Sequence, residues 1–220
     1  MQNEKENTIK AVIFDMDGVL LDTEKVCKVT WDIAASEFGI KKIGEAFYKC
    51  VGTNRHDTEA ILKDYVEGKV SPERFRERTS ELFYLVEREV GLEKKPFVYE
   101  CLSSLEEKGF RIALASSTRA QSVRRQLKNA GIIQFFETLT TGDLVEHSKP
   151  APDIYLKAAS SLDLPPCECD AVEDSPNGVR AAVAAGIKCV MVPDLIAPDG
   201  EMKRIAWKIL PSLKELDKEI

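Results

Sequence analysis

The chain has 220 residues, with 31 Lys and Arg against 37 Asp and Glu, and a formal net charge of −6. Hydrophobic residues make up 44% and charged residues 31%, a balance that supports a folded core and excludes general disorder. Net acidity argues against nucleic-acid binding, the longest apolar runs are far too short to cross a membrane, and the first ten residues hold no apolar signal core. We therefore expect a cytoplasmic protein with neither a nucleic-acid partner nor a membrane partner.

The six cysteines form neither a zinc pattern nor a disulfide pattern. No C-x-x-C occurs, and Cys167 and Cys169 are one residue too close for a zinc knuckle. His56 and His147 do not pair with a cysteine at ligand spacing. We expect reduced thiols that pack as small hydrophobic side chains.

The first predicted element is a buried strand over residues 9–14, with the sequence IKAVIF, which ends at Asp15. From about residue 22 to 93, apolar residues recur at three- and four-residue spacing, as at Val26, Val29 and Ile33. No convincing strand pattern interrupts this stretch. It predicts a small bundle of helices.

After Pro96, predicted helices alternate with predicted strands. The helices span 98–108, 120–129, 152–162 and 176–185, and the strands span 111–115, 138–141, 170–172 and 188–192. Glycines follow several of the helices. The alternation predicts an α/β fold with a doubly wound, Rossmann-like parallel sheet. Residues 1–20 and 95–220 then form one core domain, and residues 22–93 form a helical cap domain, inserted after the first strand, that lies over the edge of the sheet.

Four polar clusters are expected to meet at one edge of that sheet. They follow predicted strands or lie in a loop that enters a helix, and they comprise Asp15 with Asp17, Ser116 with Ser117, Glu173 with Asp174, and Lys149. In open α/β sheets, ligands bind beyond the carboxyl ends of the strands. Taken singly, each cluster has a structural explanation, such as a turn aspartate, a helix-capping serine or a surface lysine. Their repetition at successive strand ends instead indicates a functional site.

The carboxylates of that site would repel one another unless a cation lay among them. Mg²⁺ suits such oxygen ligands, and it typically combines one or two carboxylates with waters and a substrate phosphate. Lys149 adds a compact positive charge that can neutralise a phosphate oxygen or an attacking carboxylate. The clusters therefore favour Mg²⁺ as the cofactor and a phosphorylated ligand.

Four segments in order and at matching spacing resemble the motifs of the haloacid dehalogenase superfamily. They are DMDGVLLD (15–22), ASST (115–118), SKPAPDIY (148–155) and VEDSPNGVRAA (172–182), and the similarity covers nearly the whole chain. The helical insertion resembles the cap of the β-phosphoglucomutase-like branch. The resemblance implies Mg²⁺-dependent phosphoryl transfer on a small phosphorylated metabolite, through an aspartyl-phosphate intermediate.

The resemblance also implies roles for individual residues. Asp15 resembles the nucleophile, and Asp17 resembles the general acid and base. Asp17 must start protonated, so we expect its carboxylate neighbours to raise its pKa. Ser116 and Lys149 resemble residues that hold the transferring phosphoryl group. The implied metal ligands are Asp15, Asp17 through its backbone carbonyl, Asp174, and Glu173 in or just outside the first shell of ligands.

The cap matches the mutase pattern only in part. The stretch from Gly52 to Arg55 resembles the loop whose arginine grips a second phosphate, and Thr23 lies where the chain enters the cap. A helix-start arginine paired with nearby acids and a helix N-cap are the alternative interpretations of these two residues. The predicted substrate-binding residues are Gly18, Thr23, Arg55 and Ser117.

Cys27, Val51 and Ala120 replace a histidine, a lysine and an asparagine of the sugar phosphomutase. These departures favour hydrolysis of a small phosphomonoester, such as a sugar phosphate, by a monomeric enzyme. A β-phosphoglucomutase is the alternative enzyme. A phosphoacceptor signalling module with Asp15 as the receiver is the weaker alternative, because such modules lack a helical insertion of this size.

Overall fold

Six parallel strands form one sheet in the computed structural model, which describes residues 8–51, 53 and 55–220, with only the backbone described at 55–57. The strands are β1 (Ala11–Phe14), β2 (Arg111–Ser116), β3 (Thr138–Thr141), β4 (Cys169–Glu173), β5 (Lys188–Met191) and β6 (Lys208–Ile209). Their order in the sheet is β3-β2-β1-β4-β5-β6. The predicted doubly wound parallel sheet is confirmed. The two-residue strand β6 was not predicted, because so short a segment carries no periodic pattern.

The register of the central strands brings the polar clusters together. Strand β1 lies between β2 and β4, and Phe14 is opposite Leu114 on one side and Val172 on the other. Asp15, which follows Phe14, is therefore next to the carboxyl ends of both neighbouring strands. The side chains of this edge meet because the three parallel strands end at nearly the same level.

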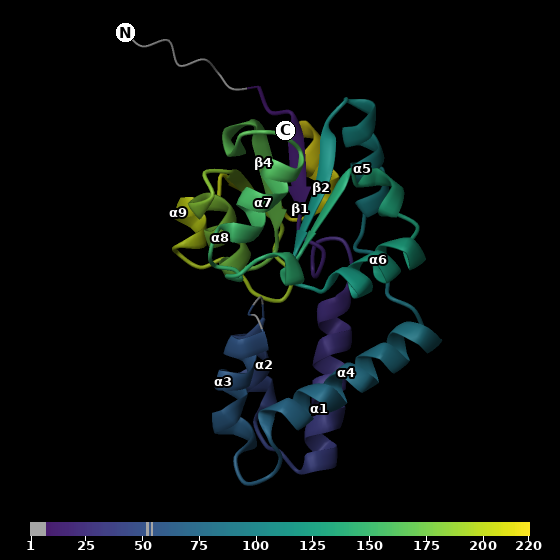
Figure 1. Cartoon of the computed structure of the whole chain (residues 1–220), viewed down its shortest axis with the longest axis vertical. Coiled ribbons are helices and arrows are strands. Elements are labelled where there is room, and N and C mark those ends of the chain that lie inside the picture. The colour runs from purple at the N-terminus through teal and green to yellow at the C-terminus, as the bar shows by residue number, and fades with distance from the viewer. Residues whose placement is uncertain (1–7, 52, 54) are drawn as a thin grey trace.

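Helices cover both faces of the sheet, as Figure 1 shows. They are α5 (Val98–Glu107), α6 (Ala120–Asn129), α7 (Asp153–Ser161), α8 (Pro176–Ala184) and the short α9 (Met202–Ile205). Alternate residues of β1 point to opposite faces of the sheet and belong to two separate cores. Phe14 packs with residues of α5 and α6, and Ile13 packs with residues of α7 and α8. The helices predicted after Pro96 are confirmed to within two residues at each end, but α9 was not predicted.

Four further helices follow β1 and lie beyond the carboxyl end of the sheet (Figure 1). They are α1 (Thr23–Phe38), α2 (Ile43–Cys50), α3 (Arg55–Val66) and α4 (Pro72–Glu89). They share a core of their own, in which Trp31 packs edge-on against Phe47 and Phe75 with ring centroids 5.4 Å apart. The predicted helical stretch is confirmed, and its described residues contain no strand.

The chain enters and leaves these four helices through two segments that lie side by side. Leu21 and Lys94 form an antiparallel bridge. The backbone N–H of Asp22 donates to the carbonyl of Glu93, and that of Lys95 donates to the carbonyl of Leu20, both at 2.9 Å. The insertion is therefore joined to the sheet through a short paired connection.

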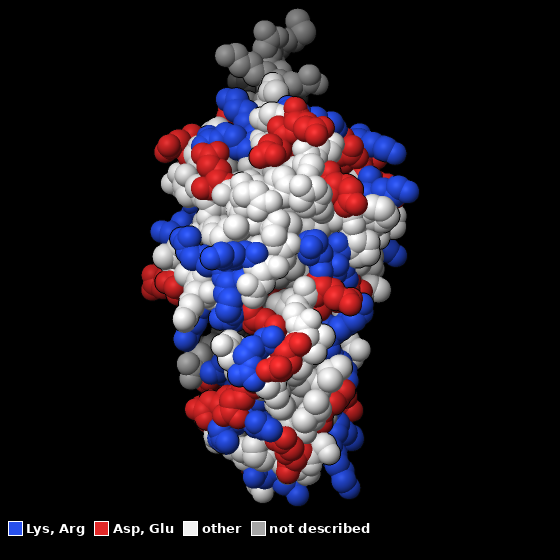
Figure 2. Space-filling view, turned by 90° about the vertical axis from the view of Figure 1, so that its right-hand side faces the viewer, with Lys and Arg blue, Asp and Glu red and all other residues white. Residues whose placement is uncertain are grey.

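Two predictions from composition can be compared with the structure. All six cysteines are free, and the four buried ones pack as small hydrophobic groups as predicted, whereas Cys167 is exposed and Cys27 is half-buried. Within the described ranges, no helix has both the length and the apolar character that a membrane span requires. Lys and Arg mix with Asp and Glu across the face drawn in Figure 2, in keeping with the small net charge.

One buried carboxylate of the sheet lies away from the strand ends. Asp170 on β4 is 2% exposed, and its Oδ1 has no hydrogen-bond partner among the described residues. Burial raises the pKa of Asp170 from 3.8 to about 6, and Lys188 opposes this shift only in part. Because the folded state binds this proton more tightly than the unfolded chain, the stabilising contribution is present at low pH and is lost as the pH rises through about 6.

Replacing Asp170 by asparagine should therefore stabilise the protein at neutral pH, by about 1 kcal/mol, because the amide removes the buried charge at the same volume. Chemical denaturation at about pH 7.5 and about pH 4.5 measures this effect, and the gain is expected to shrink at the lower pH. The exposed Asp163 supplies the control variant Asp163→Asn. An equal stability change at both pH values would contradict the prediction.

Candidate active site

Three buried carboxylates gather at the carboxyl edge of the sheet. Asp15 follows β1, Glu173 ends β4, and Asp174 follows it; one oxygen from each lies within 4.8 Å of the others. Their exposed fractions are 6%, 0% and 5%. Water cannot screen charges that are buried to this degree, so the three groups interact strongly with one another.

Lys149 is the cation that contacts this cluster. Its Nζ lies 2.6 Å from Asp15 Oδ1, 2.6 Å from Glu173 Oε1 and 3.0 Å from the carbonyl oxygen of Ala115. The side chain of Lys149 is only 3% exposed, although its sequence context suggested a surface loop as one alternative. The structure therefore brings together the predicted nucleophile, the predicted phosphate-binding lysine and one predicted metal ligand.

The ionisation of the cluster reflects a shortage of positive charge. Burial, together with the neighbouring carboxylates, raises the pKa of both Asp15 and Asp174 above the ordinary range. Burial alone would lower the pKa of Lys149, but Asp15 and Glu173 outweigh it and raise the pKa above its usual value. Three carboxylates and one ammonium group leave two negative charges uncompensated, which one divalent cation would cancel.

The donor set fits Mg²⁺. Among the described residues, no group donates a hydrogen bond to the carboxylate of Asp174 or to the second oxygen of Asp15, Oδ2. From the same residues, Glu173 Oε2 accepts only long hydrogen bonds, at 3.2 Å from the N–H of Asp174 and at 3.4 Å from the hydroxyl of Ser175. Several carboxylate oxygens at one buried point are the hard ligands that Mg²⁺ prefers.

Asp17 lies beside this cluster and accepts hydrogen bonds from both parts of the molecule. Its Oδ1 accepts from the hydroxyl of Thr23 on α1 at 2.8 Å, and its Oδ2 accepts from the hydroxyl of Thr118 at 2.9 Å. Ser116 Oγ is 3.4 Å from the same Oδ2 and accepts from the N–H of Thr118. The hydroxyl of Thr23 is therefore directed to Asp17, and it does not cap helix α1.

Gly18 gives room to a neighbouring carboxylate. Its φ of +79° lies in the left-handed region, and a Cβ there would lie 2.2 Å from Oδ2 of Asp174. A pocket of about 530 Å³ opens at this edge of the sheet, and Gly18 does not line it. Thr23 and Ser117 do line this pocket; they are the other predicted substrate-binding residues whose side chains are described. The structure therefore places Gly18 against the carboxylate of Asp174, where only a glycine fits.

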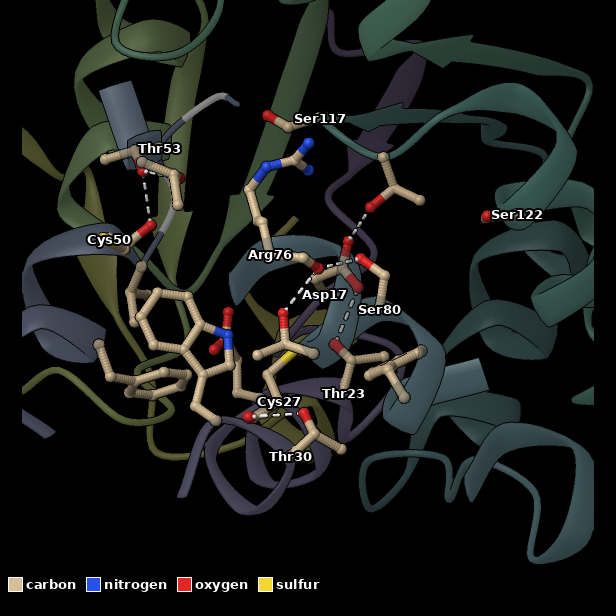
Figure 3. A pocket seen from close by; sticks show the side chains of 18 of the residues that line it. Asp17, Thr23, Cys27, Thr30, Cys50, Thr53, Arg76, Ser80, Ser117 and Ser122 are labelled. Atoms are coloured by element: carbon tan, nitrogen blue, oxygen red, sulfur yellow. Dashed lines mark hydrogen bonds between the residues drawn. The ribbon is translucent and has the colours of Figure 1, made fainter. Parts of the chain in front are cut away.

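The pocket lies between the carboxyl edge of the sheet and helices α1–α4. Asp15, Asp17 and Lys149 lie at its sheet end, and Trp31 and Phe47 form part of its apolar wall. Figure 3 shows labelled polar side chains around it from both parts of the chain, which include Thr23, Arg76, Ser80 and Ser117. The predicted residue Arg55 begins helix α3, but its side chain lies outside the described residues.

Two residues on the pocket wall bear on the mutase alternative. Cys27 and Val51 both line the pocket, at the positions where the resemblance led us to expect a histidine and a lysine in a mutase. Burial raises the pKa of the Cys27 thiol well above its ordinary value, and the charges of Glu24 and Asp17 raise it further. A thiol that stays protonated cannot serve as a base, in contrast to an imidazole.

Sequence reasoning did not single out several residues of the pocket. Thr118 is the last residue of ASST, so its place in that motif was a usable signal. Glu24 lines the pocket, and burial raises its pKa to about 8, with Asp17 and Asp194 adding to the shift. Arg76 reaches into the pocket from α4 (Figure 3), but in the sequence it is one of several arginines on a charged helix.

A further polar group in the pocket joins the helical insertion to the core. Glu87 near the end of α4 is buried, and its two oxygens accept from Nε and Nη2 of Arg125 on α6 at 2.7 and 2.8 Å. The guanidinium also lies over the ring of Tyr84 at 5.3 Å. The sequence alone does not indicate this contact, because only the fold brings Glu87 against α6.

Comparisons with known proteins agree with this geometry. The family model for haloacid dehalogenase-like hydrolases matches residues 12–192. A phosphorylated carbohydrates phosphatase of Thermotoga maritima is 34% identical over 180 residues, which cover 82% of this chain and 83% of that protein. A β-phosphoglucomutase of Bacillus subtilis is 30% identical, over 84% of this chain and 83% of its own. The crystal structure of CbbY from Rhodobacter sphaeroides in complex with phosphate has a TM-score of 0.80 at 26% identity, and the match covers 95% of this chain and 96% of that one.

Proposed function

This chain belongs to the haloacid dehalogenase-like hydrolase family, and we propose that it is a Mg²⁺-dependent phosphatase that hydrolyses a small phosphomonoester, such as a sugar phosphate. The observation that carries the proposal is the buried group of Asp15, Glu173, Asp174 and Lys149 at the sheet end of a pocket. The helices of 22–93 serve as the cap domain over a core domain of residues 1–20 and 95–220.

Two successive displacements at phosphorus account for the hydrolysis. An oxygen of Asp15 forms a bond to phosphorus while the bond to the leaving oxygen breaks, and Asp17 gives its proton to that oxygen. Water then attacks the phosphorus of the aspartyl phosphate, Asp17 takes a proton from it, and the bond to Asp15 breaks. Lys149 donates to Asp15 Oδ1, and no described residue donates to Oδ2, so Oδ2 is the oxygen available for attack on phosphorus.

The remaining residues of the site balance charge and position the reacting groups. Asp15, the backbone carbonyl of Asp17, Asp174 and Glu173 would hold Mg²⁺, which supplies charge neutralisation for the transferring phosphoryl group when bound. Lys149 and Ser116 neutralise and bind the phosphoryl oxygens. Thr23 of the cap and Thr118 of the core both donate hydrogen bonds to Asp17. Asp17 is therefore correctly placed to act as acid and base only when cap and core are together.

The wall of the pocket supports a hydroxylated, compact substrate. Thr79 and Ser80 from α4 and Ser122 from α6 bring hydroxyl groups to the wall, and Arg76 adds a guanidinium from α4. A sugar phosphate presents several hydroxyl groups that such side chains can bind. Two of the relatives are named a phosphorylated carbohydrates phosphatase and a β-phosphoglucomutase, and these names support the same substrate class.

The test is a panel of sugar phosphates, nucleotides and small phosphomonoesters, incubated with the protein and Mg²⁺. Released phosphate and isomerised sugar are measured in the same samples. We expect phosphate release, abolished by a chelator and restored by added Mg²⁺, because the carboxylate cluster is otherwise short of positive charge. Conversion of β-glucose 1-phosphate to the 6-phosphate without net phosphate release would instead establish a mutase. Stable labelling of the aspartate with no turnover would establish a receiver.

A further inference from the structure

The carboxylate of Glu173 is held in place by its neighbours in the core. It is fully buried, and Gly178 on α8 packs against it so closely that a Cβ there would lie 1.9 Å from Glu173 Cδ. Its Oε1 accepts two short hydrogen bonds, both at 2.6 Å, from Lys149 Nζ and from the hydroxyl of Tyr155. Two strong donors therefore converge on one oxygen.

Lys149 has no proton left for a ligand in this arrangement. An ammonium group has three N–H bonds, and Lys149 directs them to Asp15 Oδ1, Glu173 Oε1 and the carbonyl of Ala115. To bind a phosphoryl oxygen, the ammonium group must release one of these acceptors. Each release has a cost, because a buried acceptor that loses its donor is left without a hydrogen bond.

Of the three acceptors, Glu173 Oε1 is the one that keeps a donor after the release. Tyr155, on the first turn of α7, is fully buried, and its ring lies under Lys149 Nζ at 5.3 Å from the ring centroid. Its hydroxyl donates to the same oxygen that Lys149 would leave. In contrast, no second donor reaches Asp15 Oδ1 or the Ala115 carbonyl from the described side chains.

We propose that Tyr155 is a positioning residue: its hydroxyl keeps Glu173 hydrogen-bonded, so that Lys149 can turn one N–H from Glu173 to a phosphoryl oxygen. The inference rests on the proposed function, since it concerns the same phosphoryl site. It assigns Tyr155 no contact with the substrate. It also explains why a phenol, whose hydroxyl must be satisfied, stands at the centre of an otherwise apolar core made with Ile154, Ala158 and Val179.

The variant Tyr155→Phe isolates the hydroxyl, because the ring and its contact with Lys149 remain. The matched control is Tyr99→Phe, which makes the same chemical change at an exposed tyrosine of the core domain. Calorimetry with inorganic phosphate in the presence of Mg²⁺ measures binding, and turnover of p-nitrophenyl phosphate measures kcat and KM. Thermal unfolding shows whether either variant has lost its fold.

We expect Tyr155→Phe to bind inorganic phosphate about tenfold more weakly and to lower kcat by about 10- to 100-fold, in the range found for residues that orient a binding group. Tyr99→Phe should match the wild type. In a Lys149→Met background, adding Tyr155→Phe should change phosphate binding no further, because the ammonium group through which Tyr155 acts is absent. If Tyr155 were needed only for packing, Tyr155→Phe would weaken phosphate binding equally in the wild-type and the Lys149→Met backgrounds.

Three outcomes decide the inference. Phosphate binding by Tyr155→Phe that equals the wild type overturns it, and so does an equal loss with and without Lys149. Neither result affects the proposed function as long as the wild type still hydrolyses phosphomonoesters. A wild type that neither binds phosphate nor turns over any ester overturns the proposed function, and the inference with it.

Discussion

The variant Asp15→Asn is expected to lose phosphatase activity by about 10⁴-fold or more while it remains folded. The amide oxygen is a poor nucleophile and cannot form the aspartyl phosphate. The change also removes one negative charge from the carboxylate cluster, so the proposed Mg²⁺ should bind more weakly as well. Phosphate release from the best ester of the panel, at saturating Mg²⁺, measures the loss.

Stability should change little in the same variant. Burial of the Asp15 carboxylate is unfavourable, as its raised pKa shows, and asparagine has the same shape. Lys149 keeps Glu173 and the Ala115 carbonyl as acceptors. Thermal unfolding of Asp15→Asn should therefore fall within a few degrees of the wild type, with the exposed-site variant Asp163→Asn as the control. Turnover within about tenfold of the wild type would rule out Asp15 as the nucleophile.

The variant Gly178→Ala is expected to have the largest effect outside the catalytic residues. Its added methyl would lie 1.9 Å from Cδ and about 2 Å from both oxygens of Glu173, which is far inside van der Waals contact. Glu173 cannot move aside easily, because Lys149 and Tyr155 both hold its Oε1. We expect a loss of about 2–3 kcal/mol in the free energy of unfolding. The phosphatase activity of the molecules that remain folded should also fall, because Lys149 is hydrogen-bonded to Glu173 and moves with the displaced carboxylate.

Gly44→Ala is the matched control for that variant. Gly44 lies in helix α2, and nothing approaches within 4 Å of the Cβ that alanine would add. Alanine should stabilise this helix by up to about 1 kcal/mol and leave activity unchanged. Chemical denaturation and the phosphatase assay on both variants provide the comparison. An unchanged stability for Gly178→Ala would mean that Glu173 is free to rearrange, contrary to the packing described above.

The sequence was informative where a feature depends on local pattern. Strand β3 and helix α6 were predicted with the bounds that the structure has, because alternation, turn glycines and helix periodicity act over a few residues. The convergence of Asp15, Lys149 and Glu173 was also predictable, because parallel strands that carry motifs at their ends must share an edge.

The rest depends on contacts between residues far apart in the chain. Tyr155 and Glu173 are 18 residues apart, and nothing near either one indicates that they meet. Glu87 and Arg125 are 38 residues apart and come from two separately packed parts of the chain. The hydrogen bond from the Thr23 hydroxyl to Asp17 is a third case, since substrate binding and helix capping were the two interpretations that the sequence offered for Thr23. Side-chain packing in three dimensions decides such cases, and the pattern of one strand or helix does not.

The paired connection between Leu21 and Lys94 has a consequence for how such a protein diversifies. The two ends of the helical segment meet, and the backbone hydrogen bonds of Asp22 and Lys95 hold them together. The segment of about 70 residues is therefore attached to the sheet in the same way as a single closed surface loop. Insertions that begin and end at one point can be exchanged, lengthened or shortened without repacking the domain that carries them. Under the proposed function, a change of this one segment would alter the choice of substrate and leave the carboxylate cluster at the sheet edge unchanged.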